Sequence, residues 1–308
     1  MKRILLTGAT GYLGGHLGHP LCSKYEIVTL GRQKANHDFS ITDFQIPSFE
    51  NCDDFGDALA GVDVVIHAAA LVHQRTQDSV ELYNKVNVDF SIALAKEAIK
   101  NGCKRFVFIS SIAVNTNSSK ETITAESHVE PVGLYANSKW QAEVELMKLT
   151  ESSNIEMVII RPPMVYGPNC PGNFTLLKKI VSLPVPLPLG SIHNKKSFVS
   201  IFNLVDFISV CIEHPAAKNE LFLVSDDEDV STTELIRYII KCSGKYRVLI
   251  PFPMSVFEFA FSLIGKKELV SKLTSSMCID IEKSKRILSW SPSVSVEDGV
   301  KRSVSTSI

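Results

Sequence analysis

The chain has 308 residues, of which 45% are hydrophobic and 21% charged, and its formal net charge is −1. This length allows a sizeable hydrophobic core. The near-neutral charge provides no clustered basic face, so we do not expect nucleic acid as a partner. The basic runs are short and scattered, and we interpret them as solvated surfaces: Lys195-Lys196, Lys266-Lys267 and Lys283-Ser284-Lys285-Arg286.

Cysteine usage and the apolar segments indicate a reducing, cytoplasmic environment. The seven cysteines form no C-x-x-C motif and no paired spacing, so we expect neither a metal site nor a disulfide framework. Only three apolar residues follow Met1-Lys2-Arg3, too few for a secretory signal. The apolar stretch 251–265 contains two prolines and Glu258 and is too short to span a bilayer. We interpret it as a buried or lid-forming helix and expect no integral membrane segment.

Apolar runs of strand length alternate with amphipathic segments of helix length in the first half. Strands are expected at 4–6, 26–30, 62–67, 105–110 and 155–160. Helices are expected at 12–23, 53–60, 81–101 and 134–150. Several strand runs are β-branched with little alternation, which is typical of strands covered on both faces. The pattern predicts an α/β fold with a Rossmann-type doubly wound parallel sheet.

The pattern changes after Arg161-Pro162-Pro163, where prolines and glycines cluster up to Gly190 and argue against helix and central strand. Helices are then expected at 203–213, 232–242, 255–264 and 281–288, and short strands at 198–201 and 221–224. We therefore expect a Rossmann domain over 1–165 and a smaller mixed α/β region over 166–308. Within that region, 198–224 is expected to return to the first sheet. The cleft between the two parts is the expected ligand site.

A glycine-rich segment, Thr7-Gly8-Ala9-Thr10-Gly11-Tyr12-Leu13-Gly14, directly follows the first strand and opens a helix. Gly8 permits a tight turn, Gly11 lets the backbone approach a pyrophosphate, and Gly14 allows the helix to pack closely on the strand. The helix N-terminus supplies free N–H groups and a positive dipole end. This context predicts a dinucleotide site. The contacts expected from the loop are Gly8, Thr10, Gly11, Tyr12, Leu13 and Gly14.

The second strand ends in Leu30-Gly31-Arg32, where an acidic residue would favour NAD. An arginine there can pair with a 2′-phosphate, so Arg32 favours NADP. The competing interpretation, that Arg32 stacks on adenine or lies in solvent, is about equally supported. Asp43 is a candidate for the adenine edge. The small side chains of Ala68, Ala69 and Ala70 suit close approach of a flat cofactor to the backbone.

Tyr135 and Lys139 are spaced to project from one face of a helix. An isolated tyrosine titrates near pH ~10, too high for a base at neutral pH. A lysine ammonium one turn away and a bound nicotinamide ring both stabilise the phenolate and lower that pKa. Lys139 can also hydrogen-bond the nicotinamide ribose. Ser110 and Ser111 end the preceding strand, where a hydroxyl can hydrogen-bond a reacting oxygen.

Together these motifs resemble the extended short-chain dehydrogenase/reductases of the nucleotide-sugar epimerase/dehydratase family. The matching segments are 7–14, 67–70, Asn87 within 85–88, 108–114, 135–139 and 161–168, with 173–174, 198–206 and 290–292 extending the match towards the C-terminus. The resemblance implies a nucleotide-diphosphate sugar held by the C-terminal half, with its sugar over the nicotinamide. It also implies a possible homodimer through helices 81–101 and 134–150, by analogy alone.

By this resemblance, Ser111 is the catalytic hydroxyl, Tyr135 the acid/base and Lys139 the cation that positions the cofactor. Asn87 and Ser110 are implied as structural or cofactor-side contacts, and Pro162 as part of the nicotinamide pocket. Asn173 resembles the family's contact to the sugar-nucleotide phosphates, although an N-cap of the following helix competes with this interpretation. We expect Asn203 and Asp206 to tie the returning segment to the core rather than to touch substrate.

The residues after Ser111 discriminate among the reactions of the family. The 4,6-dehydratases need a carboxylic acid and a carboxylate there, and Ile112 and Ala113 supply neither. What remains is hydride transfer and one proton at C4. We favour a UDP-hexose 4-epimerase in surface-polysaccharide precursor synthesis, with an NADPH-dependent nucleotide-4-keto-6-deoxysugar reductase close behind. A non-catalytic dinucleotide-binding sensor or scaffold is a third hypothesis, against which the intact Ser111, Tyr135 and Lys139 argue.

Overall fold

The computed structural model describes residues 1–34, 42–50, 54–72, 79–116, 118–253 and 267–305. Its larger sheet has seven parallel strands in the order β3-β2-β1-β4-β5-β6-β9. The strands are β1 (Arg3–Thr7), β2 (Glu26–Gly31), β3 (Thr42–Gln45), β4 (Val64–His67), β5 (Arg105–Ile109), β6 (Glu156–Arg161) and β9 (Glu220–Leu223). The first six have the strand order of the doubly wound dinucleotide-binding fold. The predicted Rossmann-type sheet is thus confirmed.

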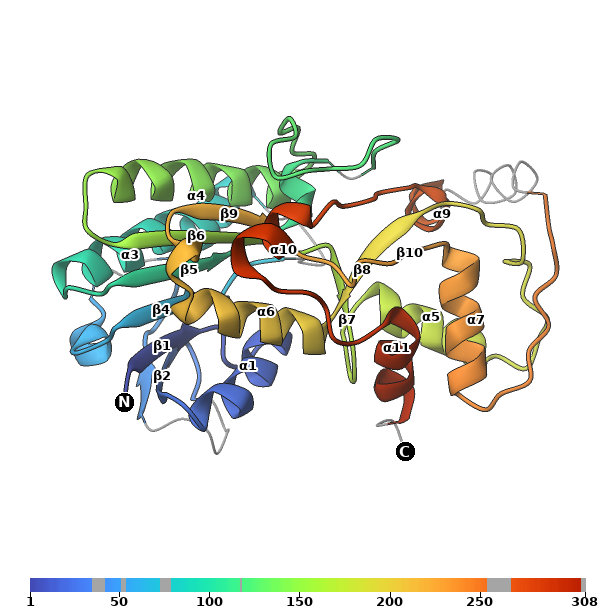
Figure 1. Ribbon diagram of the computed structural model, residues 1–308, viewed down its shortest axis with the longest axis horizontal. Helices are drawn as coiled ribbons and strands as arrows, with labels where there is room; N and C mark the ends of the chain where they lie inside the picture. The colour runs from blue at the N-terminus through green and yellow to red at the C-terminus, as the bar shows by residue number, and fades with distance from the viewer. Residues whose placement is uncertain (35–41, 51–53, 73–78, 117, 254–266, 306–308) are drawn as a thin grey trace.

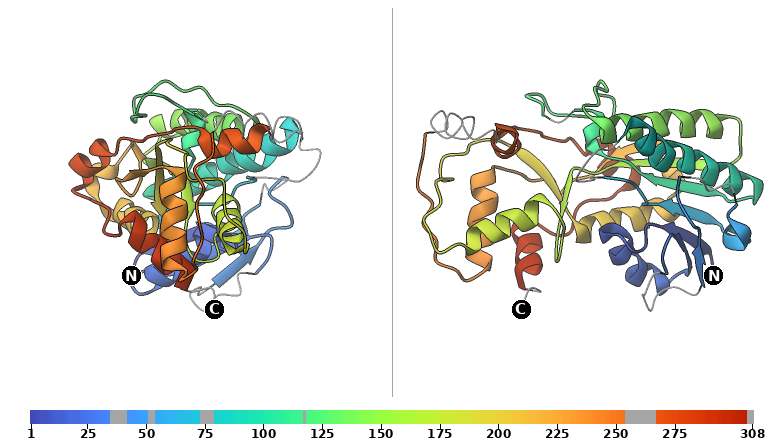
Figure 2. Two further views of the ribbon diagram at one scale, coloured as in Figure 1. Left: turned by 90° about the vertical axis from the view of Figure 1, so that its right-hand side faces the viewer. Right: turned by 180° about the vertical axis from the view of Figure 1, so that it is seen from behind.

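Helices cover both faces of this sheet (Figures 1 and 2). One face carries α2 (Val80–Tyr83), a π-helical turn η2 (Asn84–Asp89), α3 (Phe90–Lys100) and α4 (Leu134–Glu151). The other carries α1 (Tyr12–Cys22), α6 (Ile201–Glu213) and α10 (Glu282–Leu288). Neighbouring strand residues serve opposite faces, as the strand pleat requires. Leu5 packs with the α3–α4 layer, whereas Leu6 packs with the α1–α6 layer.

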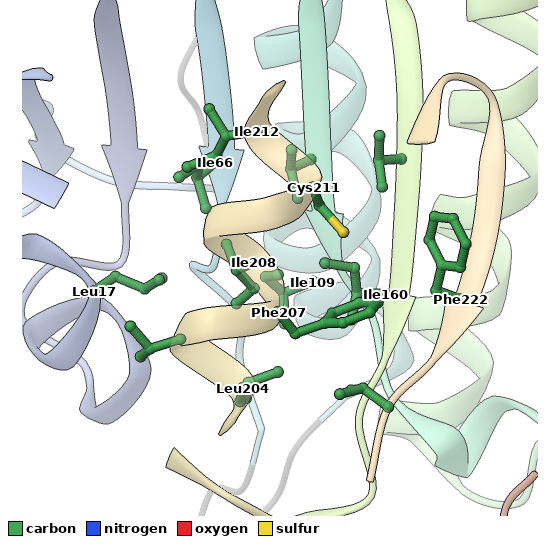
Figure 3. Packing of buried hydrophobic residues seen from close by; sticks show 14 of the residues in the cluster. Leu17, Ile66, Ile109, Ile160, Leu204, Phe207, Ile208, Cys211, Ile212 and Phe222 are labelled. Carbon is green, nitrogen blue, oxygen red and sulfur yellow. The ribbon is translucent and has the colours of Figure 1, made fainter. Parts of the chain in front are cut away.

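The layer formed by α6 shows why this helix returns to the first sheet. Its inner face presents Leu204, Phe207, Ile208 and Cys211, all fully buried. Figure 3 shows these side chains lying against residues of the central strands. Each such apolar side chain stabilises the fold by roughly 1.5–3 kcal/mol relative to full exposure. Burial on this scale fixes α6 against the Rossmann sheet.

The second part of the molecule has a three-stranded sheet in the order β10-β8-β7. It comprises β7 (Met164–Tyr166), β8 (Lys196–Ser200) and β10 (Asp229–Val230), with helices α5 (Asn173–Ser182), α7 (Thr232–Cys242), α9 (Lys267–Thr274) and α11 (Val296–Ser305) around it. These elements enclose a hydrophobic core of their own, which includes Phe174, Leu235 and Val300. The second part is therefore a small mixed α/β unit, at the right of Figure 1.

A buried polar cluster joins the two parts. The Asp226 carboxylate accepts hydrogen bonds from the Tyr166 hydroxyl (2.8 Å), the Ser200 backbone N–H (2.9 Å) and Asn203 Nδ2 (2.7 Å). Asn203 also donates to the Val294 carbonyl at 2.7 Å. Asp206 accepts from the Trp290 indole at 2.7 Å. Asn203 and Asp206 thus tie the returning segment to the core, as expected.

Several expectations for the secondary structure were wrong. The strand expected at 198–201 belongs to β8, which pairs with β7 and β10 rather than with the first sheet. The strand expected at 221–224, in contrast, is confirmed: it is β9, which pairs with β6 in the first sheet. The expected helix 53–60 is only a 3₁₀ turn, η1 (Gly56–Leu59), and Asp53 lies outside the described residues.

Two helices also differ from expectation. The segment 81–101 is interrupted by the π-helical turn η2, and α5 lies within the proline- and glycine-rich stretch. Helix α5 is possible because Pro171 precedes it and Pro184 follows it, leaving its interior without proline. The helix expected at 255–264 lies outside the described residues.

The solvated-surface interpretation fails for Lys196. Its side chain is half-buried in β8, where burial lowers the lysine pKa to about 8. Among the residues that the structure describes, no helix is both long and apolar enough to cross a bilayer. Within the same residues, no group of three or more His, Cys, Asp or Glu side chains could hold a metal ion.

Candidate active site

The glycine loop connects β1 to α1 in a conformation that requires glycine. Gly8 has φ +75°, and its carbonyl accepts a hydrogen bond from Gly11 N–H at 2.8 Å. A Cβ on Gly8 would lie 2.7 Å from the Ala69 nitrogen. A Cβ on Gly14 would lie 2.2 Å from the Gly8 carbonyl oxygen. The tight turn and the close approach of helix to strand are both present.

The N-terminus of α1 is open to a ligand. Gly11 is the N-cap residue, and no side chain caps the first turn. The first N–H groups of a helix have no partner within the helix, and they carry its positive dipole end. Thr10 and Gly11 are exposed, while Tyr12 and Leu13 are half-buried. This terminus therefore offers the backbone donors that a diphosphate needs.

The residues after β4 are fixed by a buried chain of hydrogen bonds. Thr7 Oγ1 and His67 Nδ1 are 2.7 Å apart, and His67 Nε2 and Ser91 Oγ are 2.8 Å apart. Thr7 Oγ1 also accepts from the Ala69 N–H at 3.2 Å. Burial lowers the pKa of His67 to about 3, and the charge of Lys139 contributes in the same direction. A neutral His67 thus holds the Ala68-Ala69-Ala70 segment in place beside the glycine loop.

Asn87 lies in the π-helical turn, and its amide is bonded to protein on both sides. Its Oδ1 accepts from the Leu71 N–H at 2.7 Å, and its Nδ2 donates to the Leu71 carbonyl at 3.0 Å and to Ser138 Oγ at 2.9 Å. These bonds join the segment after β4 to the first turns of α4. The sequence left open whether Asn87 is a structural residue or a cofactor contact, and this geometry favours the structural role.

Of the two expected adenosine contacts, Arg32 directly follows β2, whereas Asp43 is the second residue of β3 and lies opposite Thr29. Arg32 is exposed, and its guanidinium lies 5.2 Å from the centroid of the Phe49 ring. Asp43 is half-buried and accepts a hydrogen bond from the Thr29 hydroxyl of the neighbouring strand. Arg32 is thus a solvent-accessible cation beside an aromatic ring. The Asp43 carboxylate, in contrast, is partly used by the sheet.

Ser111, Tyr135 and Lys139 come together from η3 (Ile112–Val114) and α4. Ser111 is the N-cap residue of η3, and its hydroxyl also hydrogen-bonds Tyr135. Tyr135 and Lys139 occupy the first turns of α4, directly after Gly133 with φ +92°. Lys139 is 1% exposed, and its Nζ lies 3.9 Å from the centroid of the Phe108 ring.

Burial governs the protonation of this cluster. It raises the pKa of Tyr135 to about 12, against which the Ser111 hydrogen bond works. It lowers the pKa of Lys139 to about 7, against which the Glu143 carboxylate works. In the protein alone, burial thus favours the neutral phenol of Tyr135 and makes the Lys139 ammonium easier to deprotonate. A positive charge placed beside Tyr135 would favour its phenolate form.

Ser110 and Pro162, which the resemblance implies on the nicotinamide side, directly follow β5 and β6. Ser110 Oγ is buried and, among the described residues, has no hydrogen-bond partner. The Pro162 carbonyl accepts from the Ile112 N–H at 3.0 Å, which fixes the start of η3 against the end of β6. A buried hydroxyl without a partner, the glycine cradle and the uncapped α1 all fit a bound dinucleotide.

The positions after Ser111 contain no acid. Ile112 is 4% exposed and belongs to the core of the α1–α6 layer, and Ala113 donates its N–H to Ser111 Oγ at 3.2 Å. Asn173 is the exposed first residue of α5. The competing interpretation of Asn173 as an N-cap is wrong, because Gly172 is the N-cap residue and no side chain caps this helix.

A groove of about 1240 Å³ runs between α1 and α6. It begins at Thr10, Gly11 and Tyr12 and ends at Glu213 and His214. None of Ser111, Tyr135 and Lys139 lines it. The groove is therefore a separate surface feature that shares only the glycine loop with the candidate active site.

Two charged residues near the site were missed from the sequence. Glu143 and Arg161 form a fully buried ion pair, with side chains 0% and 2% exposed. A helix spacing signal was available, because Glu143 follows Lys139 by one turn on the same face. Arg161 also ends a strand directly after four apolar residues, and a charge in such a buried position calls for a buried partner.

A doubly wound parallel sheet, a glycine loop on α1, and a serine, tyrosine and lysine at the carboxyl ends of its strands define an NAD(P)-dependent enzyme of the short-chain dehydrogenase/reductase type. Residues 4–224 match the NAD dependent epimerase/dehydratase family. The chain belongs to this family.

Curated relatives and solved structures agree with this assignment. The chain is 40% identical to a UDP-glucose 4-epimerase of Vibrio cholerae, over 98% of this chain and 94% of the relative. It is 29% identical to an N-acetyl-α-D-glucosaminyl-diphospho-ditrans,octacis-undecaprenol 4-epimerase of Escherichia coli O157:H7, over 88% and 83%. The crystal structure of UDP-glucuronic acid 4-epimerase from Bacillus cereus with NAD has a TM-score of 0.80 at 22% identity, covering 99% and 98% of the two chains. The structural likeness supports the fold.

Proposed function

We propose that this protein is a UDP-hexose 4-epimerase that uses NAD(P) and serves surface-polysaccharide precursor synthesis. The observation that carries the proposal is the convergence of Ser111, Tyr135 and Lys139 next to two positions, Ile112 and Ala113, that provide no acid or base. Such a set supports hydride transfer and one proton transfer at a single carbon. The similarity to the Vibrio cholerae UDP-glucose 4-epimerase supports C4 as that carbon and UDP as the carrier.

Tyr135 is the group that exchanges the proton of the C4 hydroxyl. Its phenolate takes the proton from O4 as the hydroxyl becomes a ketone, and its phenol returns the proton once the ketone has presented its other face. Ser111 hydrogen-bonds the same oxygen. Lys139 supplies the positive charge that favours the phenolate. When bound, the nicotinamide supplies the hydride acceptor and donor.

The cofactor contacts that we propose follow the geometry of the loop and strand ends. The N-terminus of α1, with Gly8, Gly11 and Gly14 behind it, would hold the diphosphate. Lys139 and Ser110 would contact the nicotinamide side. Arg32, exposed at the end of β2, would contact a 2′-phosphate and so favours NADP over NAD.

We propose that the unit over residues 166–308 holds the nucleotide sugar. Asn173 lies exposed at the start of α5, whose first turn has no side-chain cap. Its amide and the free N–H groups of that turn would face the diphosphate of the substrate.

The test is incubation of the purified protein with UDP-glucose or UDP-galactose, with and without added NADPH. Interconversion of the two sugars without net consumption of NADPH supports the epimerase. Stoichiometric oxidation of NADPH with a nucleotide-4-keto sugar would support the reductase instead. Binding of the dinucleotide without turnover of either substrate would support the sensor or scaffold hypothesis.

We also propose a homodimer formed through α3 and α4. These two helices pack against each other on one outer face of the sheet (Figure 1). A paired copy would complete a four-helix contact, a common form of isologous interface. Light scattering coupled to size exclusion tests this, because a monomer mass at micromolar concentration contradicts it.

A further inference from the structure

The Glu143–Arg161 ion pair lies behind the candidate active site and has no part in the chemistry described so far. Arg161 Nε donates to Glu143 Oε1 at 3.0 Å, and Arg161 Nη2 donates to Glu143 Oε2 at 2.5 Å. Arg161 Nη1 donates to Asn115 Oδ1 at 2.9 Å. All three side chains are buried. The guanidinium fork therefore uses three of its donors on two partners from different elements.

These partners come from the elements that carry the proposed catalytic groups. Glu143 lies on α4, one turn after Lys139 and two turns after Tyr135. Asn115 is the residue directly after η3, the short helix that Ser111 begins. Arg161 is the last residue of β6. One guanidinium thus connects the helix of Tyr135 to the turn of Ser111 from the end of a central strand.

Asn115 extends the connection to the chain that leads into α4. Its Nδ2 donates to the Ser127 and His128 carbonyls, both at 3.3 Å, and its carbonyl accepts from the Glu130 N–H at 2.9 Å. The loop between Ser111 and Tyr135 is therefore held from Asn115. Movement of Arg161 would be transmitted to both ends of this loop.

The charge arrangement around Lys139 depends on the same pair. The charged and titratable groups that act on Lys139 are Glu143 on α4 and His67 on β4, and Glu143 is itself paired with Arg161 on β6. His67 is neutral at ordinary pH because burial lowers its pKa to about 3. Glu143 is thus the negative charge that opposes the burial of the Lys139 ammonium.

We propose that Arg161, Glu143 and Asn115 are positioning residues that hold the Ser111 turn against the Tyr135 helix, with Glu143 also supplying the negative charge that Lys139 faces. The proposal rests on the proposed C4 chemistry, and it assigns these residues no contact with substrate. It goes beyond a structural ion pair in one respect. A structural pair predicts loss of stability alone, whereas a positioning pair predicts altered protonation of Lys139 and a lower kcat in a folded protein.

The experiment compares Glu143→Gln, Arg161→Met, Asn115→Ala and the double variant Glu143→Gln/Arg161→Met. A single charge left buried is costly, so either single charge variant can fail to fold. The double variant removes both charges of the pair, so neither Glu143 nor Arg161 is left as a buried charge without its partner, and we expect this variant to fold. Thermal unfolding, dinucleotide affinity, kcat and KM are measured for each variant over about pH 6 to pH 9.

A matched control pair lies at the opposite end of the same strands. Arg105 at the start of β5 forms a two-bond ion pair with Glu156 at the start of β6, at 2.9 and 2.5 Å. The Arg105 side chain is 7% exposed and the Glu156 side chain is 27% exposed. Arg105→Met/Glu156→Gln should change thermal stability and leave kcat and its pH profile as in the wild type.

For Glu143→Gln/Arg161→Met we expect a dinucleotide affinity near that of the wild type. We expect its kcat to be at least about tenfold lower than the wild-type value at pH 8, and the difference in kcat to become smaller towards pH 6. The reason is that Lys139 without Glu143 has a lower pKa, and one pKa unit corresponds to about a tenfold change in the protonated fraction. Asn115→Ala should lower kcat without moving the pH profile. A double variant that folds and has the kcat and pH profile of the wild type overturns the proposal.

A readout independent of turnover separates this proposal from the proposed function. The titration of Lys139 is followed by NMR of 13C-labelled lysine, with the signal assigned by Lys139→Met. We expect the titration midpoint to be lower in Glu143→Gln/Arg161→Met than in the wild type and in the Arg105 control. An unchanged midpoint overturns the charge role of Glu143. If the wild type turns over no nucleotide sugar, the proposed function fails, and the midpoint still decides the charge role.

Discussion

Gly14 on α1 faces the carbonyl oxygen of Gly8 so closely that a Cβ added to Gly14 would lie 2.2 Å from that oxygen. The contact exists because α1 begins directly after the turn and packs on the end of β1. It makes the third glycine of the loop a requirement of the backbone itself. The dinucleotide site and the fold therefore depend on the same residue.

We predict that Gly14→Ala destabilises the cofactor-free protein by about 3 kcal/mol, because overpacking against rigid backbone forces the helix to shift. Thermal unfolding measures this loss. Gly31→Ala is the matched control, since a Cβ there meets its nearest atom at an ordinary 3.5 Å. A Gly14→Ala protein as stable as the control would show that α1 is not packed on Gly8 as described.

We predict that Tyr135→Phe lowers kcat for C4 chemistry by about 10²–10⁴-fold, the usual contribution of a general acid or base. Dinucleotide affinity should stay close to that of the wild type, because the phenol ring is retained. Ser111→Ala should lower kcat less, since it removes a hydrogen bond and not the proton-exchanging group. Full activity of Tyr135→Phe would refute the catalytic assignment.

The role of Arg32 predicts a cofactor preference. The wild type should bind NADP at least as tightly as NAD, and Arg32→Ala should weaken NADP binding by about tenfold or more while changing NAD binding little. Fluorescence titration with each dinucleotide measures both affinities. Equal losses for the two cofactors would indicate that Arg32 packs against adenine or Phe49 and does not read the 2′-position.

His67 predicts a pH dependence of stability. Its pKa is about 3 in the folded protein and near the ordinary value of 6.5 when exposed, so the unfolded chain binds more protons between these values. The contribution of His67 to stability is therefore complete above pH 6.5 and is lost progressively as the pH falls towards 3. Thermal unfolding at several pH values should show this decline.

The control for this effect is His67→Gln, which should be less stable at pH 7 because the hydrogen bonds to Thr7 and Ser91 are disturbed. Its unfolding temperature should also fall less steeply than that of the wild type between about pH 6.5 and pH 4, because the titrating group is gone. If the unfolding temperatures of the two proteins fall equally steeply with pH, groups other than His67 cause the loss of stability at acidic pH.

The first half of the fold was predictable because its signals are local. The runs that became β1, β2, β4, β5 and β6 are apolar on both faces, and the glycines stand at the turn that needs them. Strand β3 was missed because its four residues are half-buried or exposed and lack an apolar run. Strands β7 and β10 have three and two residues, too few for any periodicity.

The site residues also divide into those with a local sequence signal and those that depend on the tertiary fold. Tyr135, Lys139 and the glycine loop carry their own spacing, so sequence alone could place them. The partners of Arg161 could not be predicted, because Glu143 and Asn115 come from elements that only the tertiary fold brings together. The sheet to which β8 belongs could not be predicted either. Strand β8 pairs with β7, and no local sequence pattern specifies that pairing.

The most direct test of the proposed reaction follows one hydrogen atom at C4. UDP-glucose carrying deuterium at C4 is incubated with the protein and its bound dinucleotide, without added NADPH, and the UDP-galactose formed is analysed by mass spectrometry and NMR. The account predicts UDP-galactose that retains deuterium at C4, because the same hydrogen leaves that carbon and returns to its other face. Deuterium lost to solvent, or no UDP-galactose formed under these conditions, would contradict it.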